Sequence, residues 1–308
     1  MRKNVIIDFD PGVDDTIALM MAIKSNQLNI IALTTVFGNS TIDNTTRNAL
    51  ILKEFLKFDG PVYQGASKPL FYEKTDYGKF HGSDGLANVV FEENIAEVTK
   101  KHAWDVIYDE ALKCQGDLSL ITLGPLTNVA IALFKYEDLK KYIKEIIIMG
   151  GSATTGNNLP FSEANVVSDA YAMQAVLQSE IPLTMVGLNA TEQTRLSEDE
   201  YSEIVANNMK IDSKIKKMLV HYKEVQNNTG ARGLVIHDAA AMFVALNDDG
   251  FKKEYFNVDV ELVRNSMFGR TIVDIRKHST LNKNCGVITE IDKSKYLIAL
   301  QKALEFGE

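Results

Sequence analysis

The sequence has little of what several classes of protein require. It contains two cysteines, Cys114 and Cys285, too few for a disulfide framework or a thiolate metal site. Lys and Arg number 33 against 41 Asp and Glu, a net charge of −8, which argues against a nucleic-acid-binding surface. No apolar run reaches the roughly 18 residues of a membrane helix. No small-residue cleavage site follows the charged start. These absences predict a cytoplasmic protein without nucleic-acid or membrane partners.

Linkers and repeats are also missing. No stretch rich in Ser, Gly or Pro divides the 308 residues, and we find no internal repeat. Hydrophobic residues make up 45% of the chain and charged residues 24%, which is too apolar for a disordered chain and ordinary for a globular one. The length alone would allow two domains. We predict instead a single domain over residues 1–308.

Apolar segments of two periodicities alternate along the chain. Short β-branched runs predict strands, and longer segments with a helical stripe predict helices. The expected strands are 5–7, 29–37, 118–123, 145–149 and 183–186, and the expected helices are 16–23, 41–58, 126–135 and 169–178. This alternation predicts an α/β fold with an open, mostly parallel, Rossmann-like sheet flanked by helices.

Two regions depart from the alternation. Residues 196–228 are rich in Lys, Glu and Asn and predict consecutive helices, which we interpret as a helical insertion. Residues 255–291 predict further β structure in succession, followed by a helix from about Lys293.

An acidic segment follows the first predicted strand. Asp8 and Asp10 are two apart on a strand and therefore point to the same face, and a Pro-Gly turn leads to Asp14 and Asp15 at the start of a helix. Two carboxylates about 4 Å apart repel by on the order of 4 kcal/mol at an effective dielectric of about 20. A bound cation would remove this repulsion. Oxygen ligands favour Ca²⁺ or Mg²⁺ over zinc.

This acidic segment allows other interpretations. Taken singly, Asp14 and Asp15 are ordinary first-turn acids, and four acids within eight residues favour a metal or catalytic site. An EF-hand does not fit, because position twelve counted from Asp8 is Leu19 rather than Glu. The Asp-x-Asp start is similar to that of phosphatases of the haloacid-dehalogenase type, but here Pro11-Gly12 follows the second Asp.

The octapeptide DFDPGVDD resembles the signature of the inosine-uridine preferring nucleoside hydrolases. Further matches follow in the family's order and cover nearly the whole chain. They are Phe37-Gly38-Asn39, His81-Gly82, Asp84-Gly85-Leu86, Gly124-Pro125-Leu126-Thr127-Asn128, Met149-Gly150-Gly151, Gly156-Asn157, Glu163-x-Asn165 and His237-Asp238. The resemblance implies a metal-dependent N-ribohydrolase that cleaves purine or pyrimidine ribonucleosides to ribose and free base, with a small-molecule substrate.

The resemblance also implies a metal site. It assigns the Ca²⁺ ligands to Asp10, Asp15, Asp238 and the backbone carbonyl of Leu123. Asp10 would be the general base for a metal-bound water that attacks the sugar directly. His237 would protonate the leaving base.

The remaining site residues are expected to hold the nucleoside. Asp14 would accept a hydrogen bond from the ribose 2′-hydroxyl. The other substrate-binding residues that the resemblance implies are Asn39, His81, Met149, Asn157, Glu163 and Asn165.

Two alternatives stay open from the sequence. One is a metal-dependent phosphatase of the haloacid-dehalogenase type with Asp8 or Asp10 as nucleophile, although no Gly-rich phosphate loop is evident. The other is a non-catalytic nucleoside-binding protein. The resemblance further implies a homodimer or a homotetramer.

Overall fold

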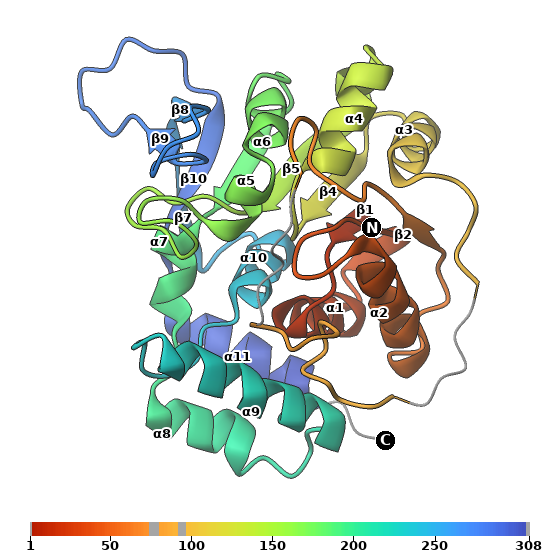
Figure 1. The fold of residues 1–308 in the computed structure, drawn as a ribbon, viewed down its shortest axis with the longest axis vertical. Coiled ribbons are helices and arrows are strands. Elements are labelled where there is room, and N and C mark those ends of the chain that lie inside the picture. Colours follow the sequence, from red (N-terminus) through yellow and green to blue (C-terminus); the bar gives the residue numbers. More distant parts are fainter. Residues whose placement is uncertain (1, 74–79, 92–96, 306–308) are drawn as a thin grey trace.

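A sheet of eight strands runs through the centre of the molecule (Figure 1). The structure is a computed structural model that describes residues 2–73, 80–91 and 97–305. Its strands are β1 (Lys3–Phe9), β2 (Leu28–Thr35), β3 (Val62–Gln64), β4 (Leu118–Thr122), β5 (Ile143–Met149), β6 (Leu183–Val186), β7 (Phe251–Phe256) and β10 (Cys285–Ile291).

The strand order is β3-β2-β1-β4-β5-β6-β10-β7. All neighbours pair in parallel except β7, which is antiparallel to β10 at one edge. The chain runs outward from β1 to β3 on one side and then returns to place β4 on the other side of β1. This reversal between β1 and β4 is a topological switch point, where open α/β sheets bind their ligands beyond the carboxyl ends of the strands.

Helices cover both faces of the sheet because successive strand residues point to opposite sides. Val5 and Ile7 of β1 belong to one apolar core and Ile6 to another. The first core is shared with α1 (Val13–Ser25), α2 (Ile42–Phe55), α10 (His237–Leu246) and α11 (Lys293–Leu304), and the second with α3 (Ala103–Cys114), α4 (Thr127–Lys135) and α6 (Ala170–Leu177). The predicted α/β class is therefore confirmed, with a parallel sheet between two helical layers.

The two irregular regions of the sequence lie apart from these layers. Residues 196–228 fold as α8 (Glu198–Tyr201), a π-helical turn (Ser202–Ala206) and α9 (Ser213–Asn228), which lie together at the bottom of Figure 1. The C-terminal β structure forms β7 and β10 of the main sheet and a separate pair, β8 (Val258–Val260) and β9 (Thr271–Val273). Two short helices, α5 (Ala164–Ser168) and α7 (Leu188–Thr191), follow β5 and β6.

Several elements were not predicted, among them β3, α3 and the short helices α5 and α7. The strand β3 has three residues, too few for a period to be recognised, and α3 was left unassigned between the predicted segments. In the part of the chain that the structure describes, no helix has the length and apolarity needed to cross a membrane. The single domain over residues 1–308 stays a prediction.

Candidate functional site

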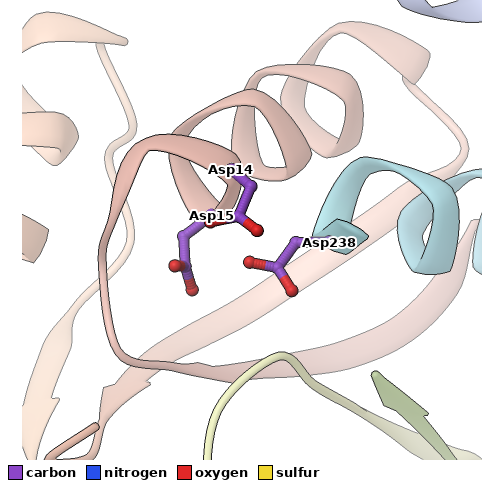
Figure 2. A group of neighbouring side chains, drawn as sticks. All are labelled: Asp14, Asp15 and Asp238. Carbon is purple, nitrogen blue, oxygen red and sulfur yellow. The ribbon is translucent and has the colours of Figure 1, made fainter. Parts of the chain in front are cut away.

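Three carboxylates meet beyond the carboxyl end of β1. Asp14 and Asp15 extend from the first turn of α1, and Asp238 faces them from the first turn of α10 (Figure 2). One oxygen of each lies within 4.8 Å of the others, and none of the three residues is more than 6% exposed. Carboxylate oxygens converging from two helix starts are a suitable ligand set for a hard cation.

The turn before α1 fixes Asp15. The backbone N–H of Gly12 donates to Asp15 Oδ2 at 2.9 Å, and Asn39 Nδ2 donates to the same oxygen at 3.1 Å. Asp15 Oδ1 is buried and has no hydrogen-bond partner among the described residues. One oxygen thus anchors the side chain, and the other remains for a ligand.

Asp10 lies beside this group, but it is not one of the three residues whose oxygens lie within 4.8 Å of one another. The backbone N–H of Asn39 donates to Asp10 Oδ2 at 2.6 Å. Gly38 and Gly124 pack against the Asp10 carboxylate so closely that a Cβ at either position would collide with it. The loops after β2 and β4 therefore hold the Asp10 side chain between them.

Burial and the neighbouring negative charges raise the pKa of two of these carboxyl groups, Asp15 and Asp238. Burial, followed by the charge of Asp14, raises the pKa of Asp15 to about 8. Burial, with the charges of Asp14 and Asp15, raises the pKa of Asp238 well above its usual value. The starts of α1 and α10 offset only about 0.3–1 kcal/mol per charge. A divalent cation fits this site, because it would neutralise carboxylates that the fold leaves short of partners.

The backbone carbonyl of Leu123 follows the neighbouring strand β4. Its oxygen accepts a hydrogen bond from Asn165 Nδ2 at 2.7 Å, and the same amide donates to the Met149 carbonyl at 3.1 Å. Asn165 thereby ties together the ends of β4 and β5. A carbonyl oxygen has two lone pairs, so Leu123 can accept this hydrogen bond and still serve as a ligand.

A cavity of about 610 Å³ opens over the carboxylates. Such a volume is in the range of small-molecule sites. The cavity is lined by every site residue predicted from the sequence except Asp10 and Asp15. Those lining it are Asp14, Asn39, His81, Leu123, Met149, Asn157, Glu163, Asn165, His237 and Asp238.

Two of the polar lining residues also organise the backbone around the cavity. Glu163 caps α5 and accepts from the N–H groups of Asn165 at 2.8 Å and Gly151 at 3.0 Å. Asn157 Oδ1 accepts from the Ala164 N–H at 3.0 Å. The irregular loop that contains these residues is therefore held in one conformation around the cavity.

His81 is a neutral side chain in this site. Its Nδ1 accepts from the backbone N–H of Val13 at 3.1 Å, which leaves the ring proton on Nε2. Burial lowers its pKa, although the nearby Asp14 opposes the shift. His81 therefore offers the cavity a neutral donor.

His237 begins α10, next to Asp238. Its Nδ1 lies 2.8 Å from Thr191 Oγ1, at the end of α7. Burial lowers the pKa of His237, and the charges of Asp14 and Glu192 partly counter this shift. The proton donor expected for the leaving base and one expected cation ligand are thus consecutive residues of one helix.

Asp8 is the exception among the four predicted acids. Its Oδ1 accepts from Thr34 Oγ1 at 2.6 Å and from Asn128 Nδ2 at 2.7 Å, and its side chain does not line the cavity. The expectation that all four acids gather at one site was wrong for Asp8, because β2 and α4 provide partners that draw its carboxylate into the core.

Several lining residues were not found from the sequence. Tyr222 and Gln226 come from α9, and Glu192 and Arg195 come from the segment after α7. The helical period of α9 does place Tyr222 on its buried face, because Ile215 lies about two turns before it and Met218 and Leu219 lie one turn before it. A buried tyrosine needs a hydrogen-bond partner for its hydroxyl, so a tyrosine on the apolar face of this predicted helix was the available indication of a polar contact.

Comparisons with known proteins agree with the geometry. The family model described as "Inosine-uridine preferring nucleoside hydrolase" matches residues 5–297. The chain is 33% identical over 274 residues to the pyrimidine-specific ribonucleoside hydrolase RihB of Shigella sonnei, which covers 89% of this chain and 88% of the relative.

Solved structures give the same result. A plant nucleoside hydrolase, the PpNRh1 enzyme, superposes with a TM-score of 0.91 at 28% identity, over 99% of this chain and all of that one (100%). The purine-preferring ribonucleoside hydrolase from Gardnerella vaginalis gives a TM-score of 0.89 at 28% identity, over 98% of both chains.

Proposed function

Because the chain belongs to the inosine-uridine preferring nucleoside hydrolase family and is a hydrolase of N-glycosyl bonds, we propose that it cleaves ribonucleosides to ribose and free base. The observation that carries the proposal is one cavity lined both by carboxylates from two helix starts and by the His237 imidazole. The relatives named above differ in base preference, so the proposal covers purine and pyrimidine nucleosides.

A calcium ion at the carboxylates is part of the proposal. Asp10, Asp15, Asp238 and the Leu123 carbonyl would hold it, and it would orient water and ribose hydroxyls and make the water more acidic. The support is the set of buried oxygen donors, with Asp15 Oδ1 lacking a hydrogen-bond partner in the described part of the chain.

Two side chains would carry out the proton transfers of the reaction. Asp10 would take a proton from the attacking water, whose oxygen forms the new bond to C1′ of ribose. The N-glycosidic bond breaks, its electron pair goes to the base nitrogen, and His237 would supply the proton to the leaving base. The anionic carboxylates would favour the positive charge that develops on the sugar.

The ribose would be held by the polar wall of the cavity. Asp14 would accept from the 2′-hydroxyl. Asn39, His81, Met149, Asn157, Glu163 and Asn165 would complete the sugar site. Alternating acceptors and donors suit a ligand whose hydroxyls can both donate and accept hydrogen bonds.

Product stereochemistry tests this scheme. Direct attack of water inverts C1′, whereas a covalent ribosyl-enzyme would give net retention. Purified protein with inosine or uridine, followed by NMR in the first turnovers, should give α-ribofuranose before the anomers equilibrate. Release of the β-anomer first would contradict direct attack, and absence of ribose from any ribonucleoside would contradict the hydrolase itself.

The alternatives have less support. For a phosphatase of the haloacid-dehalogenase type, Asp8 is held by Thr34 and Asn128 outside the cavity. A non-catalytic nucleoside binder would need neither a proton donor nor a base next to the cation ligands.

We also propose that the protein assembles as a homodimer or homotetramer, which light scattering of the purified protein would test.

A further inference from the structure

Tyr222 reaches the carboxylate cluster from α9, an element without any of the family-like motifs. Its phenol donates a hydrogen bond to Asp14 Oδ2 at 3.1 Å. Its ring packs on that of His81, with the centroids 5.1 Å apart and the planes tilted by 30°. The side chain is buried and lines the cavity. One residue of the helical insertion therefore contacts two of the expected ribose-binding residues.

The direction of this hydrogen bond is set by the surroundings. Burial, with the charges of Asp14 and Asp238, raises the pKa of Tyr222 well above its ordinary value. The phenol therefore keeps its proton and acts as a neutral donor. A neutral donor fixes the Asp14 carboxylate without cancelling its charge.

The contact leaves one oxygen of Asp14 for a ligand. Asp14 Oδ1 has no hydrogen-bond partner among the residues that the structure describes. It lies 3.7 Å from His81 Nδ1, but that nitrogen already accepts from the Val13 N–H and has no proton to give. The two oxygens of Asp14 thus have different surroundings, because only Oδ2 receives a donor.

We propose that Tyr222 is a positioning residue for the ribose 2′-hydroxyl, since it holds Asp14 with Oδ1 turned to accept from that hydroxyl. The inference rests on the proposed function, which gives Asp14 this role. If so, the sugar site includes a residue of α9. This helix contains none of the motifs that carry the family resemblance.

The test compares two variants on paired substrates. Tyr222→Phe keeps the ring on His81 and removes only the hydroxyl. Tyr201→Phe is the matched control, because Tyr201 is also a buried tyrosine of the helical insertion but does not line the cavity. The substrates are uridine with 2′-deoxyuridine, and inosine with 2′-deoxyinosine. A role exerted through the 2′-hydroxyl must disappear when that hydroxyl is absent.

For Tyr222→Phe we expect kcat/KM on the ribonucleosides to fall by on the order of tenfold to a hundredfold, the effect of one hydrogen bond to a charged group. On the 2′-deoxynucleosides the same variant should differ from the parent by less than about twofold. Tyr201→Phe should leave kcat/KM unchanged on the ribonucleosides and on the 2′-deoxynucleosides. Equal losses on both sugars would show a structural role and overturn the inference, as would no loss on either.

A binding measurement separates this inference from the proposed function. Calorimetry on the calcium-loaded protein should show D-ribose binding weakened in Tyr222→Phe and 2-deoxyribose binding unchanged. If the parent protein released no ribose from nucleosides, the hydrolase proposal would fail. The change in affinity for D-ribose, compared with that for 2-deoxyribose, would still decide the role of Tyr222. Equal weakening of both sugars would contradict that role.

Discussion

His237 and Asp238 are consecutive residues with different expected tasks. Asp238 faces the carboxylates of α1, and His237 contacts Thr191 at the end of α7. Because the start of α10 carries both, a single helix sets the distance between the cation site and the proton donor. The proton donor is needed only where the leaving group is a poor one.

Replacing His237 should therefore have an effect that depends on the leaving group. We expect His237→Ala to lower kcat on inosine and uridine by about 10²–10⁴-fold, the usual contribution of a general acid. On p-nitrophenyl β-D-ribofuranoside, whose nitrophenolate departs without a proton, the loss should be under about tenfold. Steady-state rates on both substrates measure this, with His278→Ala on the exposed surface as control. An equal loss on both substrates would show that His237 is not the acid.

Among the elements, the turn after β4 has a role that its sequence only partly reveals. Gly124 follows Leu123, and its backbone packs on the Asp10 carboxylate and on Val36. A methyl group there would meet Asp10 Oδ1. The absence of a side chain at Gly124 thus lets β4 bring the Leu123 carbonyl and Asp10 together.

We expect Gly124→Ala to weaken calcium binding by about 10–100-fold, the usual effect of displacing a group that orients a ligand. Calorimetric titration measures the affinity. The control is Gly116→Ala before β4, where φ is +91° and the nearest atom, Lys141 O, is 3.7 Å from the added carbon. That variant should lose about 1 kcal/mol of stability through backbone strain and keep its calcium affinity. Unchanged affinity in Gly124→Ala would contradict the placement of Asp10.

A feature of the fold or the site could be predicted from the sequence where the residues that produce it lie close together in the chain. The alternation of strands and helices and the acids after β1 are visible within windows of about ten residues, and they indicated the fold and one part of the site. Most of the other predicted lining residues were found through short motifs that resemble those of the family. The hydrogen bond from Tyr222 to Asp14 joins residues 208 apart, and no local pattern encodes it. The position of Asp8 was missed for the same reason, because its partners Thr34 and Asn128 belong to other elements.

At the scale of the whole molecule, the carboxylates couple stability to pH. The pKa of Asp15 is raised to about 8 in the folded, cation-free protein, against about 4 in an unfolded chain. The folded state therefore binds protons more tightly than the unfolded state between these values. This contribution to stability is complete below about pH 4 and is lost as the pH rises through about 8.

Calcium should reverse this loss, because the bound ion takes the place of the protons. We expect the increase in Tm that calcium causes to grow between about pH 6 and about pH 8.5. Thermal unfolding with EDTA and with calcium across this range measures the increase. Asp15→Asn removes one of the two carboxyl groups whose pKa is raised, so the fall in Tm with rising pH that is measured in EDTA should be smaller in this variant. A calcium effect that shrinks with rising pH would contradict the sign of the shift.

We propose above that this chain is a calcium-dependent ribonucleoside hydrolase. The most direct test measures free ribose from inosine, uridine, cytidine and adenosine with the purified protein as isolated, after EDTA, and after Ca²⁺ is added back. We expect ribose release that stops with EDTA and returns with Ca²⁺, and the four rates would rank the bases. Release that persists in EDTA after the metal has been removed, or no release from any of the four by folded, calcium-loaded protein, would contradict it.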